Sequence, residues 1–199
     1  MAIRKNTAER QREIADAALR IIATRGISAL KVATLAAEIG LTGGALYRHF
    51  ASTDAILDAV AARAVELLTA SLPDPALPSL AWLDRFAEMR AQAVGGHAGL
   101  ARLLFSEQLA LAFPETALDR LRGVVKTTSA AIARALAAGQ IRGEIRRDVE
   151  ASDLVPIVMA TVQVLAQLRA GTLIARAASP AKVWATLRTL LAPEVGGRR

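Results

Sequence analysis

The sequence predicts an all-α protein of about nine helices. Apolar residues recur at intervals of three and four along most of the 199 residues, which is the period of an amphipathic helix. No segment alternates apolar with polar residues as a half-buried strand does, and Gly or Pro separates the periodic segments. With 53% hydrophobic residues, the chain is long and apolar enough to bury a core.

The first helix is expected over residues 7–25. Gly26 follows its apolar stripe directly, and glycine commonly ends helices because it adopts the left-handed conformation without strain. The stripe consists of Ile14, Ala17, Ala18, Ile21 and Ile22.

Two short helices joined by a tight turn are expected over residues 32–50, and this pattern indicates a helix-turn-helix. Gly40 ends the first helix. Thr42 can cap the second with its hydroxyl, and Leu46 and Phe50, four residues apart, would face the first helix. The apolar stripe of the first helix consists of Val32, Leu35, Ala36 and Ile39.

Small residues and hydrogen-bond donors share the outer face of the second helix. Gly43 and Gly44 let the backbone come close to a groove of DNA. Tyr47, Arg48 and His49 can donate hydrogen bonds to phosphate oxygens. This face therefore suits contact with the DNA backbone.

Positive charge is densest in the N-terminal quarter of the sequence. The formal net charge is +7, and residues 1–50 hold eight Lys or Arg against four Asp or Glu. An excess of this size fits a nucleic-acid partner but is also common on solvated surfaces. Four cations before or on the first turns of the first helix form either an arm that reaches the DNA backbone or a solvated tail: Arg4, Lys5, Arg10 and Arg12.

The helix-turn-helix resembles the N-terminal DNA-binding domain of the TetR (tetracycline repressor) family of transcriptional regulators. The signature of that family leads from an apolar helix through a glycine turn into Gly-x-x-Tyr-x-His-Phe, and the resemblance covers roughly residues 9–60. The matching residues are Gly44, Leu46, Tyr47, His49 and Phe50, followed by Ser52, Asp54 and Leu57 where the next helix should begin.

This resemblance implies two domains. Residues 1–51 would form the DNA-binding domain and residues 52–199 an effector-binding and dimerisation domain, with the helix expected over 52–72 linking the two. The residues implied to lie at the DNA are Lys31, Ala33, Thr42, Gly43, Gly44, Ala45, Tyr47, Arg48, His49 and Thr53.

Three of these residues depart from the usual choices of the family. Lys31 stands where Thr usually opens the second helix, Gly43 where a longer polar or basic residue often reaches a base, and Thr53 where Lys commonly contacts phosphate. Lys31 can compensate for Thr53. Because Ala33 and Ala45 are also short, we expect sparse direct readout of bases and a larger part for DNA shape and dimer spacing.

Only helices are expected after residue 72. The segment 73–78 contains three prolines and is the clearest boundary in the chain. The sequence GGHAG at 95–99 is more simply a helix break than a phosphate-binding loop, because no strand precedes it. The expected helices cover 79–94, 99–113, 115–138, 152–170 and 179–191, with Gly139 ending the third and Asp148 or Ser152 starting the fourth.

Large apolar side chains, with a few amides among them, concentrate in the C-terminal part. This combination suits a pocket for a small, largely apolar effector, and small molecules bind there in the family that the chain resembles. The alternative is a filled core with the glutamines at its rim or in a dimer interface. The candidate pocket residues are Trp82, Phe86, Met89, Leu104, Phe105, Gln108, Phe113, Met159 and Gln163.

The last two expected helices carry apolar faces larger than a monomer of this size needs. In the family that the chain resembles, these helices pair with their copies in a four-helix dimer interface. A twofold dimer would also suit a palindromic operator, because its two recognition helices meet successive major grooves. The candidate interface residues are Leu154, Val158, Val162, Leu165, Val183, Trp184, Leu187 and Leu191.

The resulting hypothesis is a homodimeric, cytoplasmic transcriptional repressor that a small effector releases from double-stranded operator DNA. No enzyme, metal site or cofactor is expected, since the chain has no Cys and only two His and lacks HExxH, GxSxG and P-loop spacings. No secretory segment or membrane-spanning window of about 18–20 apolar residues is apparent. Two alternatives stay open: a helix-turn-helix protein controlled by a protein partner or by no ligand, and an all-helical enzyme or carrier.

Overall fold

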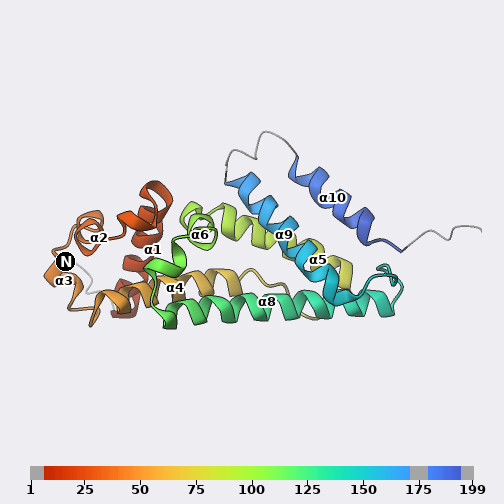
Figure 1. Cartoon of the computed structure of the whole chain (residues 1–199), viewed down its shortest axis with the longest axis horizontal. Helices are drawn as coiled ribbons and strands as arrows, with labels where there is room; N and C mark the ends of the chain where they lie inside the picture. The colour runs from red at the N-terminus through yellow and green to blue at the C-terminus, as the bar shows by residue number, and fades with distance from the viewer. Residues whose placement is uncertain (1–6, 171–178, 194–199) are drawn as a thin grey trace, which may run out of the picture. The chain divides into compact units, whose positions relative to one another are not determined.

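The computed structural model describes residues 7–170 and 179–193, and these form ten α-helices and one 3-10 helix with no strand (Figure 1). The expected all-α class is confirmed. One more helix is present than expected because the segment 99–113 forms two. The helices are α1 (Thr7–Arg25), the 3-10 helix η1 (Ile27–Ala29), α2 (Val32–Glu38), α3 (Gly43–Leu46), α4 (Thr53–Thr69), α5 (Ser79–Gly95), α6 (Ala98–Leu104), α7 (Leu109–Ala112), α8 (Glu115–Ile141), α9 (Ala151–Arg169) and α10 (Pro180–Leu191).

The chain divides into two compact units. Unit 1 comprises residues 1–67 and 97–123, and unit 2 comprises residues 68–96 and 124–199. Unit 1 therefore contains α6 and α7 as well as the helix-turn-helix, so it is larger than the segment 1–51. This division measures packing, and the functional division at residue 51 stays a prediction.

A glycine sets the packing of α1 against α6 in unit 1. A Cβ atom at Gly99 would overlap the backbone oxygen of Leu19, so the two helices approach this closely only because residue 99 has no side chain. Gly99 was expected to begin a helix, and it lies in the first turn of α6, one residue after the start. Its function is close packing.

Ion pairs tie α1 to α4 within unit 1. Arg63 Nε donates a hydrogen bond of 2.8 Å to Asp16, and Arg63 also pairs with Glu66 at 2.9 Å. The hydrogen bond to Asp16 raises the pKa of Arg63. Arg12 pairs with the same Glu66 at 2.9 Å, so the network contains two cations and two carboxylates.

Unit 2 is built on the packing of α5 against α9, with α10 against α9. Asp84 fixes α10 to α5, because it accepts hydrogen bonds from Trp184 Nε1 at 2.8 Å and from Arg188 at 2.7 Å. The fully buried side chains of this core include Leu83, Phe86, Ile132, Leu136, Ile145 and Val158.

One described helix, α9, is long and apolar enough to cross a membrane, with a mean hydropathy of 1.5. In the structure its inner face belongs to the core of unit 2, which is how the core helix of a globular unit behaves. The buried residues of α9 are Leu154, Val158, Val162, Leu165, Ala166 and Leu168.

Two helix boundaries in unit 2 differ from expectation. Gly139 lies inside α8, which continues to Ile141. A Cβ atom there would lie 2.6 Å from Ile145 Cδ1, so this glycine makes room for a core side chain and does not end the helix. The next helix, α9, begins at Ala151 after Glu150 as its N-cap, so neither Asp148 nor Ser152 starts it.

Candidate nucleic-acid interface

The turn between α2 and α3 has the geometry that the glycine predicted. Gly40 adopts a φ of +66°, its N–H donates to the oxygen of Ala37 at 3.3 Å, and the N–H of Leu41 donates to the oxygen of Ala36 at 2.8 Å. These two bonds form a Schellman motif, which satisfies the last carbonyl groups of α2. The turn is therefore fixed by the backbone of the chain itself.

The second helix of the motif is capped as expected but is shorter than expected. Thr42 Oγ1 accepts a hydrogen bond of 3.2 Å from the N–H of Ala45. The α-helix spans only Gly43–Leu46, and residues 47–49 form turns where a helix to Phe50 was expected. Two consecutive glycines at its start weaken helix formation, because glycine loses more backbone entropy than other residues.

The predicted seam between the two helices is present. Leu46 has no exposed surface and Phe50 only 6%, while Leu35 and Ala36 of α2 are also buried. Val32, at the start of the stripe, is half-buried. Burial of this seam turns the remaining face of α3 to solvent.

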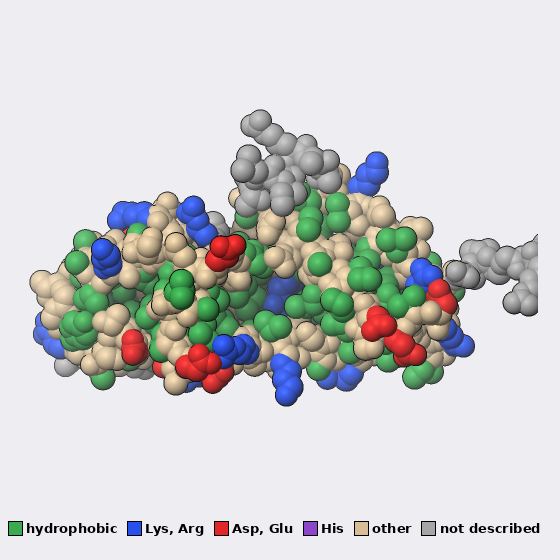
Figure 2. Space-filling model, viewed as in Figure 1, with side chains coloured by type: hydrophobic (Ala, Val, Ile, Leu, Met, Phe, Trp, Pro, Cys, Tyr) green, Lys and Arg blue, Asp and Glu red, His purple; other side chains and the backbone are tan. Residues whose placement is uncertain are grey.

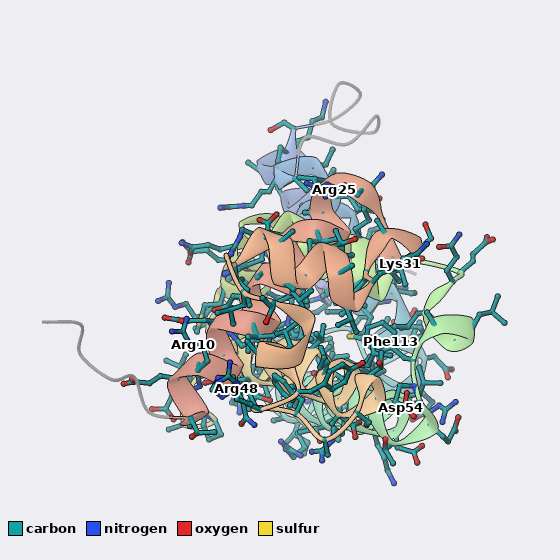
Figure 3. The ribbon with its side chains drawn as sticks, turned by 90° about the vertical axis from the view of Figure 1, so that its left-hand side faces the viewer. Arg10, Arg25, Lys31, Arg48, Asp54 and Phe113 are labelled. Carbon is teal, nitrogen blue, oxygen red and sulfur yellow. The ribbon has the colours of Figure 1, made fainter. Side chains whose placement is uncertain are left out.

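Exposed hydrogen-bonding groups lie on that face. Tyr47 is 47% exposed, and its hydroxyl lies 3.2 Å from Thr53 Oγ1 at the start of α4. Arg48 and Lys31 are exposed, and Figure 3 looks onto this end of unit 1 with the two at separate points. Figure 2 shows Lys and Arg side chains around the end that holds α2 and α3. Of the phosphate donors expected from the sequence, Tyr47 and Arg48 are thus accessible, and His49 is half-buried.

The two glycines of α3 are not required by packing. A Cβ atom at Gly44 would meet no other atom within 4 Å, and one at Gly43 would make an ordinary contact of 3.6 Å with Val32 Cγ1. Neither has the left-handed φ that favours glycine. The absence of side chains here leaves an open surface where a ligand backbone can approach closely.

One residue that holds this segment was not identified from the sequence. Gln11 on α1 donates a hydrogen bond of 2.8 Å from Nε2 to the backbone oxygen of His49. It connects the supporting helix to the turn directly after Tyr47 and Arg48. A lone amide on the first turns of an otherwise charged helix was the only signal for it.

The predicted N-terminal arm is partly engaged within unit 1. Arg10 pairs with Glu13 at 3.0 Å, and Arg12 pairs with Glu66 at 2.9 Å. Arg4 and Lys5 lie outside the described residues. The pairs of Arg10 and Arg12 are partly exposed, and exposed pairs of this kind contribute little stability and exchange readily for other anions.

The candidate pocket residues are divided between the two units, and within unit 2 Met159 packs against the core that contains Trp82 and Phe86. Trp82 and Phe86 are buried in unit 2, Phe113 is buried in unit 1, and Phe105 of unit 1 is 39% exposed. Gln108 and Gln163 are exposed. Of the remaining three, Leu104 belongs to unit 1, and Met89 and Met159 belong to unit 2, all of them half-buried.

Unit 2 contains a surface cleft that the sequence did not indicate. Its volume is about 630 Å3, and it shares only Trp82 with the expected pocket. Arg142 at its edge donates hydrogen bonds to Ser79 and Glu144, and the bond to Arg142 lowers the pKa of Glu144. The cleft is lined by the segment 75–79, Trp82, Ala131, Arg134, Ala135, Ala138, Arg142 and Glu144.

Most of the candidate dimer residues are buried in the core of unit 2. Their spacing identified the apolar face of each helix, and in the single chain this face packs into the core of unit 2. Buried are Leu154, Val158, Val162, Leu165, Leu187 and Leu191, and partly buried against the same core are Val183 and Trp184.

The fold and this surface together define a class of protein: an all-helical DNA-binding protein that joins a helix-turn-helix to a separate helical unit. Residues 14–60 match the family described as bacterial regulatory proteins, tetR family. The match covers α1 from Ile14 onward, η1, α2, the turn, α3 and the first half of α4. The helix-turn-helix segment of this chain is therefore similar to that of TetR-family transcriptional regulators.

Solved structures of low sequence identity share the fold over nearly the whole chain. The ketosteroid transcriptional regulator KstR2 of Mycobacterium tuberculosis is 19% identical, with 97% of this chain and 98% of that chain covered and a TM-score of 0.73. A transcriptional regulator from Saccharomonospora viridis in complex with choline is 22% identical, with coverages of 92% and 95% and a TM-score of 0.71.

A third structure, AibR in complex with isovaleryl coenzyme A and operator DNA, is 17% identical, with coverages of 92% and 97% and a TM-score of 0.71. A comparison with curated protein sequences finds no match.

Proposed function

We propose that the protein is a homodimeric, cytoplasmic repressor that binds a palindromic operator and is released from it by a small, largely apolar effector. The observation that carries the DNA-binding part is the surface of α3. Its donors Tyr47 and Arg48 are exposed, and no described packing contact requires Gly44 to lack a side chain. A surface of donors and bare backbone suits phosphates and groove edges.

The dimer is supported by the outer faces of α9 and α10. Ile157 is 49% exposed and Leu190 is 57% exposed, although both lie on helices whose inner faces fill the core. In a twofold dimer these faces would meet their own copies. The interface residues that we now propose are therefore Ile157 and Leu190, in place of the residues buried in the core.

The effector part is supported by the bound molecules of similar structures, isovaleryl coenzyme A in one and choline in another. An effector that prefers the DNA-free state shifts the population towards that state. Each tenfold difference in its affinity for the two states provides about 1.4 kcal/mol.

The DNA-binding proposal is tested by mobility shift with the DNA that flanks the gene. The wild-type protein should retain a fragment of this DNA at low salt. Tyr47→Ala should abolish the shift, whereas Tyr47→Phe, which keeps the ring, should weaken it less. Unchanged binding by the folded Tyr47→Ala protein would contradict the proposed interface, and no binding by the wild type would leave the all-helical enzyme or carrier as the better explanation.

Sedimentation tests the dimer. The wild-type protein should sediment as a dimer at micromolar concentration, and Ile157→Glu with Leu190→Glu should give a folded monomer, because the interface would then have to bury charges. Leu111→Glu is the matched control, since Leu111 is 89% exposed on α7 in unit 1 and should leave the dimer intact. A monomeric wild-type protein would overturn this part of the proposal.

A further inference from the structure

A half-buried guanidinium lies in unit 2 at the end of a stack of side chains on α5. The rings of Trp82 and Phe86 stack with their centroids 5.3 Å apart and an interplanar angle of 12°. Arg90 Cζ lies 5.2 Å from the centroid of Phe86. Trp82, Phe86 and Arg90 are spaced by four residues and therefore share one face of α5. We call these three residues the α5 stack.

Arg90 makes fewer polar contacts than its position requires. Arg90 Nη2 donates a hydrogen bond of 3.2 Å to Oγ1 of Thr128, a residue of α8 that is itself only 1% exposed. Arg90 Nε is buried without a hydrogen-bond partner, and it is the one such side-chain atom in the described part of the chain. A buried donor without a partner is rare in folded proteins.

The carboxylates of α5 do not pair with Arg90. Asp84 accepts from Trp184 and Arg188, and Glu88 pairs with Arg85 at 2.8 Å. Among the described residues, no carboxylate forms an ion pair with Arg90. The charge is therefore balanced by one hydroxyl and one aromatic face.

An unpaired cation in this position is unfavourable. Burial lowers the pKa of Arg90 to about 10, so the guanidinium still carries its charge at neutral pH. Buried charges are normally paired because desolvation is not otherwise compensated. An anion placed against Nε and the neighbouring donor would complete the set of contacts, and a guanidinium fits the two oxygens of a carboxylate well.

We propose that the effector is a small acid with an apolar body and that Arg90 binds its carboxylate. This inference rests on the proposed function, because it names the chemical class of the effector. Phe86 and Trp82 would lie beside the apolar body. Trp82 also borders the 630 Å3 cleft, whose lining contains neither Phe86 nor Arg90, so the cleft meets the α5 stack at Trp82 alone.

The proposal separates two classes of effector. A carboxylate would form an ion pair with the guanidinium of Arg90, whereas a quaternary ammonium compound would be repelled by it. The exposed arginines Arg134 and Arg142 of the cleft provide a competing location for an anion, and Arg142 is already bonded to Glu144. The two locations are distinguishable by mutation.

The test uses calorimetric titration of the full-length protein with sodium octanoate, 1-octanol and choline chloride. Octanoate should bind the wild-type protein at least about tenfold more tightly than octanol, equivalent to about 1.4 kcal/mol, and choline should not bind. Arg90→Met should remove the preference for octanoate over octanol. Arg85→Met, which removes an exposed arginine from the same helix, should keep it.

Thermal unfolding provides a second readout, which distinguishes ligand binding by Arg90 from a purely structural function of this residue. Without a ligand, Arg90→Met should be at least as stable as the wild type, because it removes a buried charge. Octanoate should raise the melting temperature of the wild-type protein but not that of Arg90→Met.

Three results would overturn the proposal: equal octanoate binding by Arg90→Met, loss of binding in Arg134→Met with Arg90→Met unaffected, or no binding by straight-chain acids from butanoate to decanoate. Operator binding is measured on the same samples. A protein that binds its operator and is released by a neutral or cationic compound would refute the acid effector and retain the proposed repressor.

Discussion

The helix-turn-helix end of unit 1 and the core of unit 2 differ in whether their polar groups have hydrogen-bond partners. At the helix-turn-helix, the Thr42 hydroxyl accepts a hydrogen bond from the N–H of Ala45, and the Tyr47 hydroxyl lies within hydrogen-bonding distance of Thr53 Oγ1. The exposed donors there are solvated. Inside unit 2, Arg90 Nε has no partner. The polar groups of a surface site can all be satisfied, by the protein or by water, before the ligand binds. A buried site that needs a ligand contains a polar atom without a hydrogen-bond partner.

The largest effect is expected where unit 1 depends on a missing side chain. Gly99→Ala should destabilise the protein by about 3 kcal/mol, because its methyl group would overlap the backbone of Leu19, which cannot move as a flexible side chain can. Chemical denaturation measures the change.

Gly123→Ala is the matched control for Gly99→Ala. A Cβ atom at Gly123 meets nothing within 4 Å, and alanine is the better helix former, so this variant should gain about 0.5–1 kcal/mol. Equal stability of the two variants would show that α1 and α6 do not pack as described.

The next effect separates DNA contact from folding. Gly44→Ala should leave the free energy of unfolding unchanged or slightly raised, because the added methyl group has open space. Operator affinity should nevertheless fall by roughly tenfold, about 1.4 kcal/mol, since the methyl group would stand between the backbone of α3 and the DNA. Fluorescence anisotropy with labelled operator measures this affinity, and an unchanged value would remove α3 from the interface.

A smaller effect should follow from loosening the support of the same surface. Gln11→Met removes the donor to the oxygen of His49 and keeps the length of the side chain. We expect operator affinity to fall by about fivefold, consistent with one hydrogen bond of about 1 kcal/mol. Gln92→Met, on the exposed face of α5, is the control, and equal affinities of the two variants would argue against a positioning function of Gln11.

The smallest effect concerns an exposed pair at the cleft of unit 2. The hydrogen bond from Arg142 lowers the pKa of Glu144, so its contribution to stability is present above the pKa of the unfolded state and is lost as the pH falls through the lowered pKa. The melting temperature of Glu144→Gln should therefore lie slightly below that of the wild type at neutral pH. The two curves should converge in acid, and a difference that grew in acid would contradict this sign.

Local features of the fold could be predicted because they depend on neighbouring residues. The span of α1, the Gly40 turn and the cap at Thr42 follow from spacing and from the conformations that each residue type allows. The prediction of Gly139 as a helix end had the same local basis and was wrong, whereas Gly99 lies in the first turn of α6, as expected; at both glycines the structure adds a packing contact. Ile145 and the backbone of Leu19 occupy the space that a side chain would need.

The sequence by itself determined the all-helical class and the local geometry of the helix-turn-helix, because both depend on short-range patterns of residues. Only the tertiary structure decided which apolar faces are buried in the core and that Ile157 and Leu190 stay exposed. It also decided that Nε of Arg90 is buried without a hydrogen-bond partner, since an arginine on an amphipathic helix finds its partners across space and not along the chain.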